Sequence, residues 1–128
     1  PTQRVIAMSY LLLIHEPVGQ RATRSEAEGQ AAYAAMVAFG ERLAARGQLK
    51  AVESLAGLDS AVRVSHAGGQ ARVLDGPFAE AKEMVGGFFL LQNVTRDQAI
   101  ALAHECPAAQ WCTVEVRALA PCFSDGPA

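Results

Sequence analysis

The stretch Asp75-Gly76-Pro77-Phe78-Ala79-Glu80-Ala81-Lys82-Glu83 leads from a turn into the most apolar segment of the chain, Met84 to Leu91. Asp-Gly-Pro is typical of a turn, because aspartate bonds to the nearby backbone and glycine adopts conformations that other residues avoid. The apolar run predicts a strand covered on both faces, in which Gly86-Gly87 lets the strand bend or meet another backbone closely. Four charged side chains in nine positions make the stretch a candidate functional site as well.

Length and composition limit the kind of protein. The chain has 128 residues, of which 51% are apolar and 19% charged, so we expect one domain with a substantial core. The net charge of −2 argues against nucleic acid as a partner. No apolar run reaches the roughly eighteen residues of a membrane span, and the first residues lack the order of a signal peptide. Three cysteines without a C-x-x-C pair are typical of reduced thiols, so we expect a cytoplasmic protein.

The segment before the hairpin predicts a strand, a helix and a second strand. Val5 to Ile14 is almost continuously apolar and predicts a strand covered on both faces. Ser25 and Glu28 form a capping-box sequence, and an apolar stripe with helical spacing follows until Gly47, which predicts a helix. Leu49 to Leu55 predicts the second strand.

The rest of the chain predicts a hairpin, a strand, a helix and a strand. Residues 61–66 and 70–74 flank Gly68-Gly69, and their alternation predicts a hairpin with one face in water. After the apolar strand, Thr95 and Gln98 form a second capping box, and Pro107 ends the helix. Thr113 to Ala118 predicts the last strand.

This order predicts an α+β fold. Without the hairpin the elements run βαββαβ, which is the ferredoxin-like arrangement, with both helices on one face of an antiparallel sheet. The other face is apolar along Met8–Ile14 and Met84–Leu91, and a monomer would leave it in water. We therefore expect a homodimer joined through its sheet faces. The expected boundaries are an N-terminal extension at 1–7, the domain at 8–120 and a C-terminal tail at 121–128.

Several short motifs carry a family resemblance. They are Met8-Ser9-Tyr10-Leu11-Leu12-Leu13-Ile14, Gly47-x-Leu49, the Asp75–Glu83 stretch, Gly86-Gly87-Phe88, Cys106-Pro107 and Val114-Glu115-Val116-Arg117. With these motifs the chain resembles the YCII-related family, in its DGPF branch, over residues 8–120. The resemblance implies a dimeric α+β barrel.

Two positions depart from the pattern of that family. Its members share a histidine in the first helix and an aspartate before a proline after the second helix, and both residues are suspected of catalysis. In this sequence the two positions fall near Met36 and on Cys106. The suspected family mechanism therefore does not transfer to this chain, and any chemistry must use other residues.

Asp75 is the candidate catalytic residue. A carboxylate at the end of a strand, in a cleft lined by apolar strands, acts as a general base if burial raises its pKa. The alternative is that Asp75 accepts backbone hydrogen bonds and fixes the Gly-Pro turn.

The candidate substrate-binding residues are Phe78, Glu80, Lys82, Glu83, Arg117 and His15. The charged residues that follow Phe78 either orient a ligand or form a solvated charge cluster with an internal ion pair. Arg117 either holds a carboxylate by a two-pronged contact or pairs with Glu115 or Glu83 across strands. His15 is the one histidine at a strand end, and no two histidines have the spacing of a zinc helix. We expect no metal site and no cofactor.

Two functions remain open at this point. The first is a small-molecule pocket that acts as a lyase or isomerase on a small acidic or cyclic metabolite, by analogy with dimeric α+β barrels such as muconolactone isomerases and dehydrochlorinases. The second is a non-catalytic ligand-binding or interaction module with the same pocket. The sequence does not decide whether the protein is an enzyme.

Overall fold

The structure of the chain, a computed structural model, describes residues 7–127, so the expected extension at 1–7 lies almost wholly outside the described residues. Within them six strands form: β1 (Met8–Pro17), β2 (Leu49–Ser54), β3 (Val62–Ala67), β4 (Gln70–Asp75), β5 (Glu83–Val94) and β6 (Thr113–Ala118). The helices are α1 (Glu26–Ala45) and α2 (Arg96–Glu105), with 3₁₀ turns η1 (Gln20–Thr23), η2 (Leu58–Ser60) and η3 (Pro107–Gln110). No helix in 7–127 is long and apolar enough to cross a membrane.

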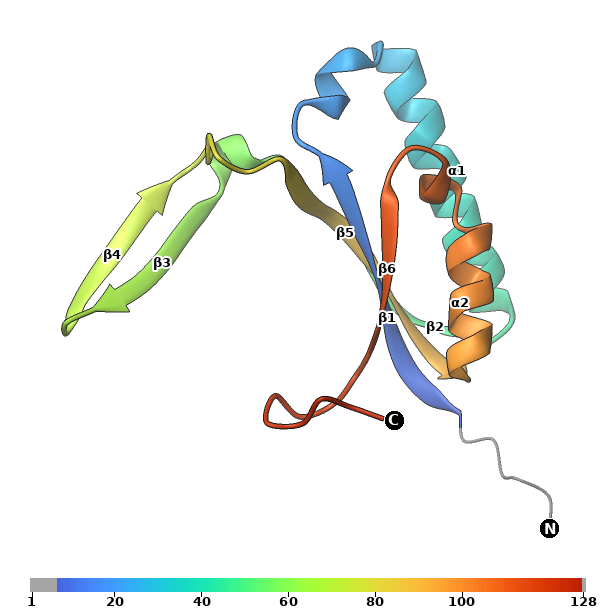
Figure 1. Ribbon diagram of the computed structural model, residues 1–128. Coiled ribbons are helices and arrows are strands. Elements are labelled where there is room, and N and C mark those ends of the chain that lie inside the picture. The colour runs from blue at the N-terminus through green and yellow to red at the C-terminus, as the bar shows by residue number, and fades with distance from the viewer. Residues whose placement is uncertain (1–6, 128) are drawn as a thin grey trace.

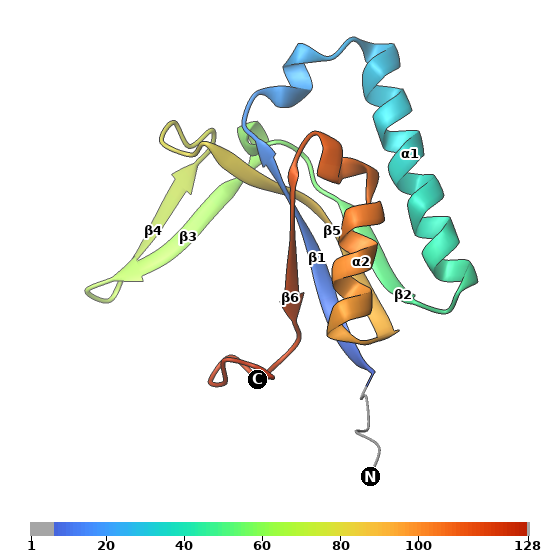
Figure 2. The same cartoon turned by 45° about the vertical axis from the view of Figure 1, so that its right-hand side comes forward.

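Four of the strands form one antiparallel sheet in the order β2-β5-β1-β6. The two strands from the middle of the chain, β3 and β4, form a separate hairpin. Both helices lie on the same side of the sheet, while the hairpin projects away from it (Figures 1 and 2). This arrangement confirms the predicted ferredoxin-like α+β fold with an inserted hairpin.

The helix ends follow the predicted capping signals. The Ser25 hydroxyl accepts a hydrogen bond from the Glu28 backbone N–H, and the Glu28 carboxylate accepts one from the Ser25 N–H. These hydrogen bonds hold the pKa of Glu28 below its usual value. After α1 the chain turns at Gly47, whose φ of 70° is a left-handed conformation that favours glycine. The second box, at Thr95 and Gln98, begins α2 in the same way.

The core lies between the helices and one face of the sheet, which we call the inner face. Tyr10, Leu12 and Ile14 of β1 are buried there, together with Phe39 and Leu43 of α1. The ring of Phe39 meets the ring of Phe89 edge to face, with centroids 5.1 Å apart, and so joins α1 to β5.

The opposite, outer face of the sheet carries alternate residues of the same strands. Leu11 and Leu13 of β1 lie beside Leu90 and Phe88 of β5, and all four side chains are half-buried. Both helices pack on the inner face, so neither covers these side chains (Figure 1). The sequence predicted that β1 and β5 are covered on both faces. Within one chain they are covered on one face only.

The β3–β4 hairpin is exposed on both faces, although the sequence predicted water on one face only. All twelve residues of the two strands are exposed, including the directly opposed Val64 and Val73, each at 65%. The reason for the difference is that the ribbon projects beyond the sheet and no helix packs on it (Figure 2). Any cover for its apolar side chains must come from outside the single chain.

The Asp75–Glu83 stretch shapes the base of this hairpin. The backbone N–H of Gly76 donates to the Ala61 carbonyl at 2.8 Å, and a Cβ at Gly76 would lie 1.9 Å from the Leu58 carbonyl oxygen. Phe78 is 4% exposed, and the guanidinium carbon of Arg63 lies 3.7 Å from its ring centroid. Gly76 and Phe78 of the motif thus fix the geometry of the chain at the base of the hairpin.

Candidate functional site

A cavity of about 610 Å³ lies between α1 and the inner face of the sheet. Its volume falls within the roughly 300–1,000 Å³ of small-molecule sites, and apolar side chains supply most of its wall. Tyr33, Met36 and Val37 of α1 line it together with Phe89 of β5, and Trp111, after η3, also contributes to its wall. A second hollow follows the hairpin, but all six residues that line it belong to the exposed ribbon.

Small residues on both walls leave the space open. Gly29, Ala32 and Gly40 face the cavity from α1, while Gly86 and Gly87 form part of β5 opposite them. A Cβ at Gly87 would lie 2.8 Å from the Glu53 carbonyl oxygen, so this glycine lets β2 approach β5 closely, as the sequence predicted. Small residues on both walls thus leave room in the cavity, and Gly87 brings β2 and β5 together at its edge.

The polar feature of the cavity wall is an ion pair between Glu16 and Arg21. Glu16 is 6% exposed, and the Arg21 Nη2 and Nε atoms donate to its carboxylate oxygens at 2.5 to 3.2 Å. Arg21 Nη2 also donates to the Leu55 carbonyl at 2.8 Å, which ties η1 to the end of β2. A Cβ at Gly86 would lie 1.9 Å from Glu16 Oε1, so this glycine makes room for the carboxylate.

A second polar group joins η1 to the segment after η3. The Gln20 amide donates to the Trp111 carbonyl at 2.7 Å, and the Cys112 thiol lies 3.5 Å from Gln20 Oε1. Burial, followed by the negative charge of Glu16, raises the pKa of Cys112 above its ordinary value. At neutral pH Cys112 therefore lines the cavity as a thiol and not as a thiolate nucleophile.

The two positions suspected of catalysis in the resembling family meet beside this cavity. The Cys106 Sγ atom lies 3.9 Å from the Met36 Sδ atom, and Met36 lines the cavity. Burial raises the pKa of the Cys106 thiol, so it too stays protonated at neutral pH. Two sulfur groups without charge thus occupy the place where the resemblance implies an acid and a base.

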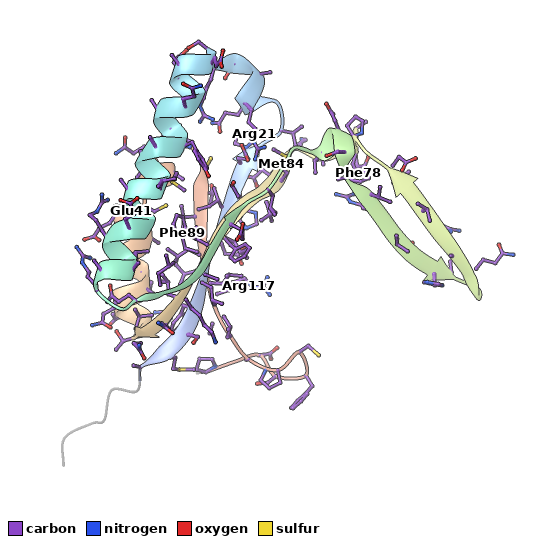
Figure 3. All side chains as sticks on the ribbon, turned by 180° about the vertical axis from the view of Figure 1, so that it is seen from behind. Arg21, Glu41, Phe78, Met84, Phe89 and Arg117 are labelled. Carbon is purple, nitrogen blue, oxygen red and sulfur yellow. The ribbon has the colours of Figure 1, made fainter. Side chains whose placement is uncertain are left out.

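Two of the predicted site residues come together on the outer face. His15 Nε2 lies 2.5 Å from Glu115 Oε1, and Arg117 Nε lies 3.6 Å from Glu115 Oε2. Arg117 pairs with its strand neighbour, as one of the two interpretations predicted, and lies on the opposite side of the sheet from Phe89 (Figure 3). Neither His15 nor Arg117 is among the residues that line the cavity.

The remaining predicted residues lie near the base of the hairpin. Asp75 ends β4 with its side chain exposed, and no hydrogen bond or ion pair within residues 7–127 engages its carboxylate. Glu80 lies 3.7 Å from Arg63, while Lys82 and Glu83 are exposed where β5 begins. None of these residues lines the cavity, and Asp75 lacks the burial that would favour a general base.

The sequence interpretation missed the charged residues of the cavity, although one signal was available. Tyr10, Leu12, Ile14 and Glu16 alternate along β1 and share one face, so a period-two pattern places a carboxylate at the end of the buried row. The predicted strand ended at Ile14, whereas β1 continues to Pro17, and Glu16 was therefore left outside the predicted strand. Within residues 7–127 no three histidine, cysteine or acidic side chains gather in a group that could hold a metal ion.

Comparison with known proteins found a matching domain family and a similar protein. Residues 8–122 match the model of the YCII-related domain. A protein of Rhizobium meliloti (strain 1021), described as uncharacterized, is 30% identical over 115 residues, which cover 88% of this chain and 93% of that protein.

Proposed function

The chain belongs to the YCII-related family, and on that premise we propose that it forms a homodimer in which each subunit binds a small organic molecule between α1 and the sheet. The observation that carries the proposal is the cavity of about 610 Å³ with one buried carboxylate, Glu16, held by Arg21 in a largely apolar wall. Sites with this composition bury the body of a ligand and orient it through a few polar groups.

Binding without turnover fits the cavity better than lyase or isomerase chemistry. Such a reaction needs a group that moves a proton at the ligand. Arg21 engages both oxygens of Glu16, and the neighbouring sulfur groups of Met36 and Cys106 are neither acid nor base at neutral pH. We therefore favour a ligand-binding or regulatory module.

The outer face supports the homodimer. Leu11, Leu13, Phe88 and Leu90 form a contiguous apolar surface at the centre of the sheet. A monomer would leave this surface in water, which is unusual for an apolar patch of this size. Two sheets that meet face to face would cover these leucines.

Trp111 allows a direct test of ligand binding. It is the one tryptophan of the chain, and it lines the cavity, so its fluorescence reports on an occupant. We expect compounds from a metabolite panel to change this fluorescence in the wild type, and Ala32→Phe to weaken binding at least about tenfold because the added ring fills the cavity.

Ala34→Phe is the matched control, since Ala34 is exposed on α1 and does not line the cavity. It should bind as the wild type does. Equal binding by both variants, or the absence of any fluorescence change across the panel, would contradict the proposed site.

A further inference from the structure

One cation in the cavity wall, Arg24, forms no ion pair and no side-chain hydrogen bond within residues 7–127. Arg24 follows η1 and lines the cavity half-buried, with its guanidinium carbon 5.6 Å from the centroid of the Trp111 ring. Arg21 beside it donates through Nε and Nη2 to the Glu16 carboxylate and to the Leu55 carbonyl. Within residues 7–127, by contrast, no carboxylate lies within 4.0 Å of the Arg24 guanidinium, and no side-chain hydrogen bond engages it. A guanidinium has five donors in a planar fork that matches a carboxylate.

Among the described residues, no carboxylate of the cavity wall forms an ion pair with Arg24. Arg21 neutralises Glu16, and the Cys112 thiol is uncharged at neutral pH because burial raises its pKa. Of the charged side chains that line this end of the cavity, two are guanidinium groups and one is a carboxylate. Glu28, at the start of α1, interacts with Arg24 through space but does not line the cavity. The Arg24 guanidinium is half-buried beside the Trp111 ring, and a charge-assisted hydrogen bond to it is stronger than one between neutral groups.

The other carboxylates of the wall lie elsewhere. Glu41 is on the C-terminal half of α1, about 24 Å along the helix axis from Ser25 at 1.5 Å per residue. Glu53 alternates with Val52 and Ser54 in β2, so its side chain points to the outer face. Within the described chain, the wall of the cavity therefore carries Arg24 without a paired wall carboxylate beside Trp111 and is apolar along Met36, Val37 and Phe89.

We propose that the cavity takes a small amphipathic carboxylic acid, with its carboxylate on Arg24 and its apolar body between α1 and Phe89. This inference rests on the proposed ligand-binding function and names the class of ligand. Trp111 holds the guanidinium from one side by a cation–π contact, which leaves the donors of the fork free for the ligand. The apolar body lies along Met36 and Val37.

The test compares two acids with their neutral amides, 3-phenylpropionate with 3-phenylpropanamide and octanoate with octanamide, by titration of Trp111 fluorescence. At least one acid should bind the wild type about ten- to hundred-fold more tightly than its amide, as expected of a hydrogen bond to a charged group. Arg24→Gln should remove this preference, because it weakens binding of the acid much more than binding of the amide. Arg24→Lys should keep part of it, because it retains the charge and loses the fork.

Arg42→Gln is the matched control. Arg42 also lies over an aromatic ring, 5.7 Å from the centroid of Phe39, but it does not line the cavity. It should keep the full preference for the acid, and thermal unfolding should show that all variants remain folded. Equal binding of acid and amide, or an equal loss in Arg24→Gln and Arg42→Gln, would overturn the carboxylate anchor and leave the binding cavity standing. Failure of both acids and both amides to bind would contradict the anchor and the proposed function together.

Discussion

The two faces of the four-stranded sheet are built by the same strands and carry similar apolar side chains, yet the chain treats them differently. On the inner face, Leu12 and Phe89 are buried under the helices. On the outer face, Leu13 and Phe88 are half-buried by their neighbours alone. Because side chains alternate along a strand, each strand supplies a core residue and an outer-face residue in turn. Apolar content alone therefore does not distinguish a core face from an interface face. Whether a helix of the same chain covers the face makes the difference.

The faces also differ in how they hold charge. On the inner face, Glu16 is buried and pinned by Arg21, so its geometry is set by the fold. On the outer face, Glu115 pairs with His15 and Arg117 at the partly exposed margin of the apolar surface. A buried carboxylate held by one arginine suits the wall of a ligand site, whereas a cluster in which every side chain is partly exposed suits the rim of an interface.

Truncation of adjacent residues on β1 gives the largest expected contrast between the faces. Leu12→Ala should lower the free energy of unfolding by about 3 kcal/mol at every protein concentration, because it leaves a void in the core. Leu13→Ala should lower it measurably only where the wild type is a dimer, because the loss falls on association. Urea denaturation at two protein concentrations checks both. Equal, concentration-independent losses would remove the distinction between the faces.

The three thiols give a smaller test of the same contrast. Burial raises the pKa of Cys106 and Cys112 on the inner side, so at about pH 8 a smaller fraction of each is thiolate than in a free thiol. Cys122 lies exposed in the C-terminal tail. Iodoacetamide should therefore modify Cys122 first, Cys112 more slowly and the buried Cys106 last.

The rate at Cys112 should rise about tenfold per pH unit until the pH reaches its raised pKa, because the thiolate is the reacting form. Peptide mass mapping over time follows each site separately. Modification of Cys112 as fast as that of Cys122 near pH 8 would mean that this wall of the cavity is open to bulk solvent.

Much of the fold could be predicted because its signals are local. Both capping boxes, the stop at Gly47 and the strand Thr113–Ala118 lie where the sequence placed them, since each depends on neighbouring residues alone. The Asp75–Glu83 stretch identified the family, but its glycine and phenylalanine act at the hairpin base and not in the cavity. A motif specific enough to identify a family can therefore have a structural role.

The cavity could not be predicted because it depends on contacts between distant segments. Arg24 and Trp111 meet only when η1 and the segment after η3 fold against each other, and Gln20 joins the same two segments. The catalytic role of Asp75 stays a prediction, and within one chain its exposed position at the end of β4 offers no pocket for it.

The most direct test of the contrast between the faces is the mass of the protein measured by light scattering at micromolar concentration. The wild type should have twice the 13.5 kDa of one chain. Leu13→Lys should be a single chain, because its ammonium group reaches water and the opposite Glu115 in the monomer but would be buried between two sheets. Ala38→Lys, on the exposed side of α1, should remain a dimer. A wild type with the mass of one chain, or a Leu13→Lys variant that stays dimeric, would contradict the account of the outer face.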